Sequence, residues 1–378
     1  MKILLIGEYS RLHNSLKEGL VALGHEVVLL STGDGFKSYP ADILLGRKFT
    51  RGWKRKFRIG WYRLTGVDLS ASALQREFFR HQAELKGFDL VQLINESPLG
   101  ATPGVEKRIV EFLSAYNEKM FLLCCGTDHL SVKYIHDKKQ VYSILNSYFE
   151  GKTTAAQNDG ALKYLRPDFV SLHHFVYERI NGVIASSIDY HLPMNGHPKY
   201  LGMIPNPVNT DKIVQKAWPD TERVVILHGI NRNSYFKKGN DYFEQALEKL
   251  QQSHGEKILI KTVEDLPYSE YIKAFDSAHL VLDQVYGHDQ GYNALEAMAC
   301  GKVVLTGAET EFVQHYDLDR EVAVNVKPDV DQIYGQLTRL VEQPELIRAI
   351  GTNAREFVVS HHHYVKIAER YLECWNSN

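Results

Sequence analysis

Short, continuous apolar runs alternate with stretches of helical periodicity along the first half of the chain. One such stretch, residues 11–25, has apolar side chains at helical spacing and a glycine where a helix would end. Apolar strands separated by helices indicate a parallel sheet that is covered on both faces. The predicted strands lie at residues 2–7, 26–31, 89–94, 119–126, 182–187 and 200–207.

The same alternation starts again after Pro207. A chain of 378 residues is longer than one hydrophobic core usually serves. The pattern therefore predicts an α/β protein with two doubly wound, Rossmann-like domains, residues 1–205 and 206–360. Two such domains leave a cleft that faces the carboxyl ends of both sheets, where ligands bind in this fold class. The strands predicted for the second domain lie at residues 223–229, 257–263, 279–285, 302–307 and 321–326.

Composition and charge narrow the possible functions. Lys and Arg total 44 against 46 Asp and Glu, a balance that argues against a general nucleic-acid binder. The 4 cysteines lie beside apolar runs without the spacing of metal ligands, which is typical of buried thiols in a reducing compartment. No window reaches the length of a membrane span, and the first apolar run is too short for a signal peptide. We expect a cytoplasmic protein.

The loops after the predicted strands hold the candidate chemistry. The first loop keeps only Gly7 of a G-x-G-x-x-G pattern, so dinucleotide binding is not expected there. The loop after residues 223–229 combines Arg232, Lys237 and Lys238 just before a helix. Guanidinium and ammonium groups suit phosphate, and a helix start adds N–H groups. A solvated basic loop is the alternative, but the position at a strand's carboxyl end favours an anion site.

A second anion site is predicted where residues 287–291 lead into a helix that begins near Tyr292. Glu296 lies a little over one turn into this helix, among small and apolar residues. A buried carboxylate is costly unless it is paired. Because helical side chains lean toward the N-terminus, this one can reach the cleft and accept hydrogen bonds from two neighbouring hydroxyls, such as those of a ribose. An ion pair with a nearby Lys or Arg is the alternative.

Several segments resemble, in order, those of the GT-B retaining glycosyltransferases of family 4. The segment GYNALEAMACGKVVL (291–305) resembles the family's donor-site signature. The resemblance covers most of residues 180–375 and is weak before residue 120. In that family the closing helix crosses back to the first domain, which implies the same for residues 361–378. The other similar segments are GVIASSIDYHL (182–192), MIPNPVNTDKI (203–213), EDLPYSEYIKAFDSAHLVL (264–282) and HHHYVKIAERYLECW (361–375).

The resemblance implies roles for particular residues. Glu296 would hold the nucleotide ribose, while Arg232 and Lys238 would hold the diphosphate and act in catalysis. Eight positions before Glu296 the family commonly has a second glutamate for the donor sugar, where this chain has His288. The further residues that we assign to donor binding are Lys237, His288, Asp289, Gln290, Gly291, Tyr292 and Asn293.

The acceptor side is predicted in the N-terminal domain, at Gly7 and Glu8. Many relatives carry a histidine directly before a glycine that corresponds to Gly126, and this chain has Cys125 there. Asp128 or His129 would take the place of that histidine.

The implied activity is transfer of a sugar from a nucleotide diphosphate donor to a hydroxyl of a glycan or lipid-linked glycan, with retention of configuration. UDP is favoured by its frequency in the family, surface polysaccharide or glycoconjugate synthesis is the expected setting, and no metal or other cofactor is expected. Two alternatives stay open. A GT-B sugar-nucleotide epimerase would need no acceptor, and a non-catalytic sugar-nucleotide-binding subunit, which His288 suggests, would bind the donor without turnover.

Residues 47–63, RKFTRGWKRKFRIGWYR, contain eight Lys or Arg, no acid and five aromatic residues. Basic side chains attract anionic lipid, and aromatic rings suit the membrane interface. We therefore expect peripheral contact with the inner face of a membrane. A mobile basic loop is the alternative, and no nucleic-acid partner is expected because no known binding fold accompanies the stretch. The residues assigned to membrane contact are Arg51, Trp53, Lys54, Arg55, Lys56, Arg58 and Trp61.

Overall fold

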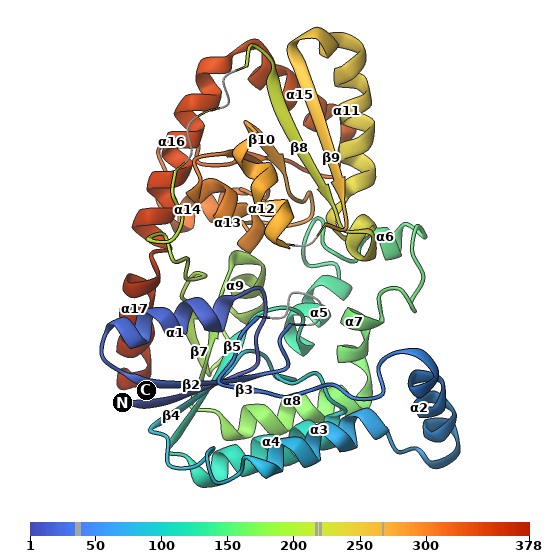
Figure 1. Cartoon of the computed structure of the whole chain (residues 1–378), viewed down its shortest axis with the longest axis vertical. Helices are drawn as coiled ribbons and strands as arrows, with labels where there is room; N and C mark the ends of the chain where they lie inside the picture. Colours follow the sequence, from blue (N-terminus) through green and yellow to red (C-terminus); the bar gives the residue numbers. More distant parts are fainter. Residues whose placement is uncertain (35–38, 216–217, 219–220, 267) are drawn as a thin grey trace.

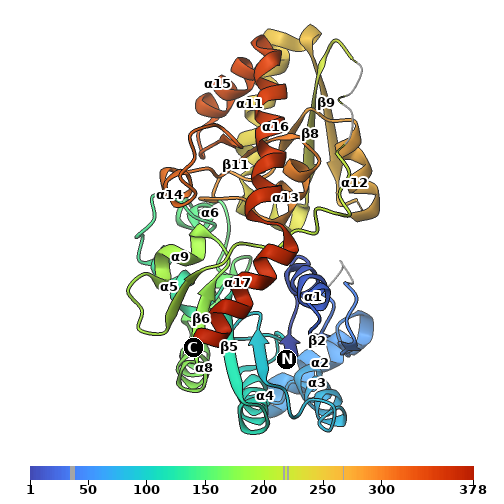
Figure 2. The ribbon, with the colours of Figure 1, turned by 90° about the vertical axis from the view of Figure 1, so that its left-hand side faces the viewer.

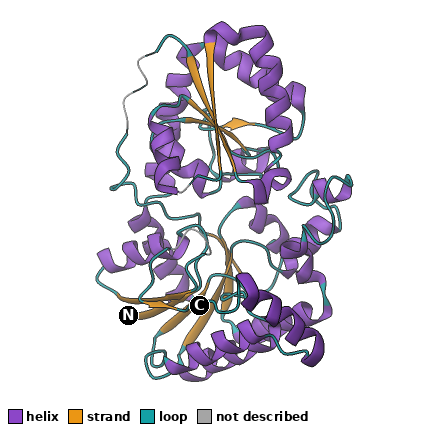
Figure 3. Ribbon diagram, turned by 45° about the vertical axis from the view of Figure 1, so that its right-hand side comes forward, coloured by secondary structure: helices purple, strands orange, loops and turns teal. Residues whose placement is uncertain are grey.

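The computed structural model describes residues 1–34, 39–215, 218, 221–266 and 268–378. Two parallel sheets lie one above the other (Figure 1), and helices flank each of them (Figure 3). The predicted α/β architecture of two doubly wound domains is confirmed.

The strands of the first domain are β1 (Lys2–Ile6), β2 (Glu26–Ser31), β3 (Ile43–Leu44), β4 (Leu90–Leu93), β5 (Lys119–Cys124), β6 (Gly182–Ala185) and β7 (Tyr200–Met203). They form a 7-stranded parallel sheet in the order β3-β2-β1-β4-β5-β6-β7. Its helices are α1 (Leu12–Ala22), α2 (Gly52–Thr65), α3 (Leu69–Arg80), α4 (Pro103–Tyr116), α5 (His129–His136), α6 (Asn146–Phe149), α7 (Asp159–Leu162), α8 (Pro167–Arg179) and α9 (Ile188–Met194), with a 3₁₀ turn, η2 (Lys163–Leu165).

The alternating faces of β1 explain why its sequence is apolar after Lys2. Ile3 and Leu5 pack in one core cluster with α1, while Leu4 and Ile6 pack in another with α3, α4 and α8. All four side chains have no exposed surface. A strand that is covered on both faces has no position where a polar residue would reach water.

The second domain repeats this arrangement with β8 (Val224–Ile230), β9 (Ile258–Glu264), β10 (Leu280–Leu282), β11 (Val303–Thr306) and β12 (Val324–Asn325). The sheet is 5-stranded, in the order β12-β11-β10-β8-β9. Its helices are α10 (Tyr235–Lys238), α11 (Asn240–His254), α12 (Tyr268–Asp276), α13 (Tyr292–Ala299), α14 (Thr310–His315), α15 (Val330–Glu342) and α16 (Pro344–His361), with 3₁₀ turns η3 (Arg232–Ser234) and η4 (Gly255–Lys257).

The last helix, α17 (Tyr364–Ser377), continues from α16 and lies against the first domain (Figure 2). Its Trp375 is fully buried and donates a hydrogen bond from Nε1 to Oε1 of Gln92, 3.0 Å away. At Gly19 of α1, a Cβ atom would lie 2.3 Å from the carbonyl oxygen of Tyr364, so only glycine permits this helix contact. The chain therefore ties both domains together at its C-terminal end.

Among the described residues, no helix is long and apolar enough to cross a membrane. The basic stretch around residue 55 folds into α2, which stands away from both sheets at one side of the molecule (Figure 1). No disulfide links the four cysteines, all of which lie in the described part of the chain.

Candidate functional site

The loop after β8 brings Lys238 to the carboxyl end of the second sheet. Lys238 ends α10, and Gly239 follows it with a positive φ of 73°. A Cβ atom at Gly239 would lie 2.2 Å from Cγ2 of Val285, so glycine is required by both conformation and space. The carbonyl of Lys238 accepts a hydrogen bond from the backbone N–H of Val285 at 3.1 Å. This contact fixes Lys238 against the end of the neighbouring strand.

Asp283, directly after β10, holds the side chain of Lys238. Its Oδ1 accepts hydrogen bonds from Lys238 Nζ at 2.8 Å and from Asn293 Nδ2 at 3.1 Å. Its Oδ2 accepts from the hydroxyl of Thr306 at 3.2 Å. We call these four residues the Asp283 cluster. Burial lowers the pKa of Lys238, but the Asp283 carboxylate outweighs this, and the pKa is raised. Lys238 therefore remains a cation with part of its side chain open to solvent.

The start of α13 lies within the Asp283 cluster, because Asn293, a member of the cluster, is the second residue of this helix. Gly291 precedes the helix in an extended conformation, and no side chain of the described residues caps it. The first N–H groups of an uncapped helix point outward and carry partial positive charge. Lys238 and this helix start together form a site for an anion such as phosphate.

A cavity of about 240 Å³ lies between the two domains, beside α13. One face of α13 lines it, because Tyr292, Glu296 and Cys300 are spaced four residues apart. The hydroxyl of Tyr292 donates to the carbonyl of Pro207 at 2.7 Å, which ties the helix start to the segment between the domains. Glu296 thus faces the gap between the domains, where the sequence predicts it.

Other walls of the cavity come from three parts of the chain. α1 contributes Ser15, the residue before it contributes Arg11, and α12 contributes Ile272 and Lys273. Lys212, in the segment between the domains, contributes a further ammonium group. The cavity thus combines an apolar wall, several cations and the carboxylates of Glu296 and Asp276. Such a mixture suits a ligand with a ring, hydroxyls and negative charge.

Arg232 contacts residues outside the Asp283 cluster. Its side chain is half exposed and forms a two-point ion pair with Glu264, the last residue of β9, with Nε 3.0 Å from Oε2. Its backbone N–H donates to Asp265 at 3.1 Å. Arg232 must therefore leave Glu264 before its guanidinium can bind another anion. Lys237, next to Lys238, is exposed.

The loop before α13 contacts the first domain. His288 lies with Nδ1 2.8 Å from Oδ1 of Asp189 in α9, and its ring stacks on Tyr142 at 5.3 Å between centroids. Asp289 accepts a hydrogen bond from the backbone N–H of Ile188 at 2.7 Å. The buried amide of Gln290 donates to the carbonyl of Gly307 at 2.7 Å. These three side chains, which the sequence predicts to bind the donor, are bonded to protein groups in this structure.

Gly7 and Glu8 lie at the carboxyl end of β1. Gly7 has a φ of 88°, and a Cβ atom there would lie 2.3 Å from Cγ2 of Ile94. Glu8 is buried, and its Oε2 accepts from the backbone N–H of Asn14 at 2.9 Å and from its Nδ2 at 2.6 Å. Its Oε1 has no hydrogen-bond partner among the described residues. Burial raises the pKa of Glu8 to about 7.

The raised pKa of Glu8 predicts a pH-dependent stability that Glu8→Gln removes. Between the ordinary value of 4.5 and about 7, the unfolded chain ionises this carboxyl while the folded chain keeps it protonated. Ionisation therefore favours unfolding, and stability falls as pH rises through this window. The shift corresponds to roughly 3 kcal/mol, at ~1.4 kcal/mol per pH unit. The quantity to measure is the midpoint of thermal unfolding of Glu8→Gln minus that of the unaltered protein. We expect this difference to increase from pH 4.5 to pH 7.

Glutamine is suited to this comparison because its oxygen can accept from Asn14 while its neutral amide occupies the other position. The same substitution at exposed Glu26 is the control and should leave the pH profile unchanged. Parallel unfolding curves for Glu8→Gln and the unaltered protein across the window would refute the raised pKa.

Asp128 and His129 are held by structural contacts at the start of α5. Asp128 caps the helix by accepting from the backbone N–H of Ser131 at 2.7 Å, and the Ser131 hydroxyl accepts in return from the N–H of Asp128 at 3.1 Å. The N–H of His129 donates to buried Glu96 at 2.8 Å, and its Nδ1 lies 2.9 Å from the carbonyl of Tyr164. Their predicted part in acceptor binding stays a prediction.

Two members of the site were missed by sequence reasoning: Asp283 and Thr306. Asp283 and Thr306 are polar residues at or directly after the ends of apolar strands, a position that could have drawn attention to them. Among the described residues, no group of three or more His, Cys, Asp or Glu is placed to hold a metal ion.

Residues 216–373 match a family model described as glycosyl transferase-like, and no curated protein matches the sequence. Sucrose-phosphate synthase from Thermosynechococcus elongatus is 16% identical, with a TM-score of 0.64 over 100% of this chain and 99% of that chain. HepE from Anabaena, solved with UDP-glucose, is 13% identical, with a TM-score of 0.60 over 100% of both chains.

WaaG, a glycosyltransferase involved in lipopolysaccharide biosynthesis, is 15% identical, with a TM-score of 0.59 over 98% of both chains. These likenesses span both domains and show the fold. The protein thus has the GT-B fold of these structures, and its residues 216–373 are similar to glycosyl transferase-like proteins.

Proposed function

We propose that this protein transfers a sugar from a nucleotide diphosphate donor, with UDP favoured, to a hydroxyl of a glycan or lipid-linked glycan, with retention of configuration. One observation carries the proposal. Lys238 is held by Asp283 at the uncapped start of α13, one turn before Glu296, which faces the cavity between the domains. All three residues lie within the segment that matches the glycosyl transferase-like family model.

Lys238 and the start of α13 would act on the leaving diphosphate. When the bond between the anomeric carbon and the diphosphate oxygen breaks, negative charge grows on that oxygen. A cation and outward-pointing N–H groups that are already in place stabilise this charge without reorganisation. This electrostatic task requires no metal ion. In the retaining reaction that we propose, the leaving phosphate itself takes the proton of the acceptor hydroxyl.

Glu296 would bind the ribose of the same nucleotide. Tyr292 lines the cavity, and the adjacent Asn293 belongs to the Asp283 cluster. A nucleotide can therefore span the first turn of α13, with its diphosphate beside Lys238 and its ribose hydroxyls on the Glu296 carboxylate. The preference for UDP is supported by HepE, which was solved with UDP-glucose.

His288 favours a second candidate function, a subunit that binds a sugar nucleotide without turnover. Its ring occupies the position where related enzymes commonly have a carboxylate for the donor sugar, and Asp189 and Tyr142 already contact it. A sugar bound here would lack that carboxylate. Turnover, rather than binding, therefore separates the two candidates.

A thermal-unfolding screen over UDP-, GDP- and ADP-sugars tests the proposal. A ligand that binds only the folded state stabilises it by about 2.7 kcal/mol at a concentration of ~100 Kd. We expect UDP-sugars to raise the unfolding midpoint by several degrees and the other two classes to raise it less.

The stabilising donor is then incubated, carrying a radiolabelled sugar, with and without a glycolipid extract. Radiolabel that appears in lipid only when the extract is present supports the transferase. Binding without any product favours the non-catalytic subunit, an altered sugar nucleotide without extract favours an epimerase, and no stabilisation by any sugar nucleotide refutes the proposal.

A further inference from the structure

α2 is attached to the molecule at its two ends and lies outside both cores. It begins after Arg51 and ends at Gly66, which has a φ of 70°. Arg58 pairs with Asp68 at 2.9 Å, and Asp68 in turn caps α3. All 14 residues of α2 are described, and none is buried. The helix stands out at one side of the first domain (Figure 1).

One side of α2 is a continuous apolar stripe. Successive residues of a helix are about 100° apart, so residues spaced three or four apart share a face. Trp53, Phe57, Trp61 and Leu64 follow this spacing, and the rings of Phe57 and Trp61 lie 6.1 Å apart. Their exposed fractions are 72%, 51%, 41% and 85%. In α1, by contrast, Leu12, Leu16 and Leu20 have the same spacing and no exposed surface. The stripe of α2 therefore faces solvent where such a face is normally covered.

Basic side chains border this stripe. By the same helical geometry, Lys54 lies on one side of it, and Lys56 and Arg63 lie on the other. Within the described chain, Arg58 is the residue of α2 that forms an ion pair. The whole chain has a formal net charge of −2, so the positive charge of α2 is a local feature.

The apolar stripe and the cations that border it indicate which kind of partner covers the stripe. A second copy of α2 would bring the same cations face to face without any acid between residues 47 and 63 to offset them. An anionic bilayer offers negative headgroups to the bordering cations and an acyl region to the stripe. Tryptophan rings are enriched at this boundary.

We propose that α2 is an interfacial helix that binds the surface of a bilayer containing anionic lipid, with Trp53, Phe57, Trp61 and Leu64 inserted below the headgroups. The helix then holds the first domain against the membrane. This inference does not rest on the proposed sugar transfer, because the contact needs neither donor nor acceptor.

Flotation with vesicles of phosphatidylcholine, alone or with phosphatidylglycerol, measures the binding of the whole protein. We expect strong binding only to the anionic vesicles, and weaker binding as salt screens the charges. Each basic side chain contributes roughly fivefold to partitioning, which corresponds to about 1 kcal/mol. The double variant Lys54→Glu, Lys56→Glu, at two of the cations that border the stripe, should therefore bind at least ~25-fold more weakly.

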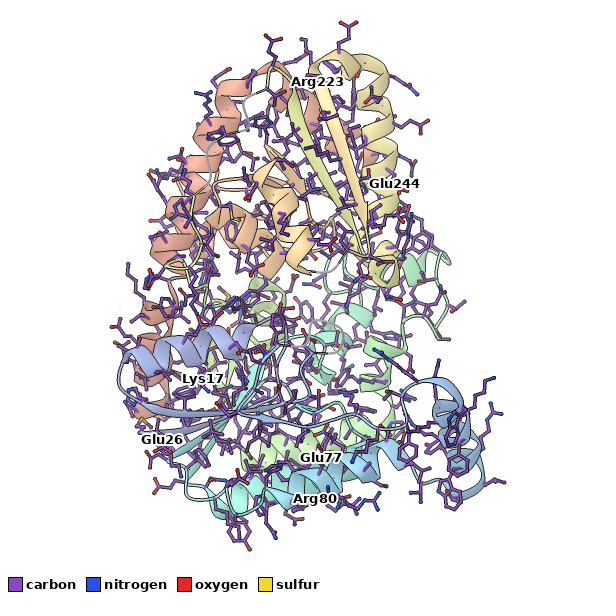
Figure 4. The ribbon with its side chains drawn as sticks, in the orientation of Figure 1. Lys17, Glu26, Glu77, Arg80, Arg223 and Glu244 are labelled. Carbon is purple, nitrogen blue, oxygen red and sulfur yellow. The ribbon has the colours of Figure 1, made fainter. Side chains whose placement is uncertain are left out.

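The matched control is Arg223→Glu, Lys257→Glu, which makes the same change of charge at exposed residues of the second domain. Figure 4 shows Arg223 at the end of the molecule opposite to the first domain. This control should bind anionic vesicles like the unaltered protein. Equal loss in both double variants, or equal binding to neutral and anionic vesicles, would overturn the proposal.

Quenching of tryptophan fluorescence by brominated lipid tests insertion of the stripe. Trp375 is fully buried and Trp218 packs against the core of the second domain, so the surface-exposed Trp53 and Trp61 report on the bilayer. We expect quenching on anionic vesicles that is lost in the variant Trp53→Phe, Trp61→Phe. A variant Trp53→Ser, Leu64→Ser should lose vesicle binding while it keeps its circular dichroism spectrum. Binding to a polyanion such as heparin without quenching by brominated lipid would contradict a membrane role.

Discussion

Replacing Lys238 with alanine is expected to lower the rate of sugar transfer at saturating donor by about 10²- to 10³-fold, the usual effect of removing one preorganised group that stabilises charge in the transition state. Lys238 makes this contribution only if its ammonium group points at the leaving oxygen, and the Asp283 cluster holds it in place. Nucleotide affinity should fall much less, because the start of α13 still binds phosphate. Single-turnover measurements with radiolabelled donor check the loss directly.

The alanine variant also leaves the buried Asp283 carboxylate without its cation, which costs roughly 3–5 kcal/mol when a buried pair is broken. The double variant Lys238→Ala, Asp283→Asn removes both charges and should recover most of the stability but none of the turnover. Lys249→Ala is the matched control, since Lys249 also pairs with a carboxylate, Asp331, but on an exposed surface of the same domain. Recovery of turnover in the double variant would show that Lys238 acts only through the fold.

Most strands could be predicted from sequence because burial on both faces leaves few polar positions, whereas β3, with two residues, is too short to give such a pattern. ILLI in β1 and VVL in β11 are apolar for this reason. α2 was not predicted as a helix, although Trp53, Phe57, Trp61 and Leu64 carry the helical period, because its many charges suggest an open loop. The short helices between β5 and β6 depend on distant contacts, such as Glu96 with His129 and His173. No local pattern encodes such contacts.

The candidate site could be predicted in part because parallel sheets bring the loops after their strands to one edge. Lys238 and Glu296 lie in loops or helix starts after strands, a position that the topology alone brings to the gap between the domains. The partner of Arg232 is Glu264 at the end of the adjacent strand β9, and strand order cannot be read from one sequence. The contact of His288 with Asp189 joins the two domains and depends on how they close.

Glu296→Ala is expected to weaken UDP binding by about 10- to 100-fold, because a carboxylate that accepts hydrogen bonds from hydroxyls contributes roughly 1.5–3 kcal/mol. The sharper expectation concerns the ligand. The unaltered protein should bind UDP more tightly than 2′,3′-dideoxy-UDP by a similar factor, and Glu296→Ala should bind the two with nearly equal affinity. Isothermal titration calorimetry of both ligands with both proteins gives four affinities. These yield the coupling free energy between the Glu296 carboxylate and the ribose hydroxyls.

This comparison isolates the ribose contact from the rest of the site, because the diphosphate and the base are identical in the two ligands. Glu270→Ala, at an exposed acid of α12, changes the net charge of the same region equally and should keep the preference for UDP. If Glu296→Ala still distinguishes UDP from its dideoxy analogue, the ribose lies elsewhere. The exposed face of Glu296 in the cavity would then belong to another part of the ligand, and the path of the nucleotide across the first turn of α13 would be wrong.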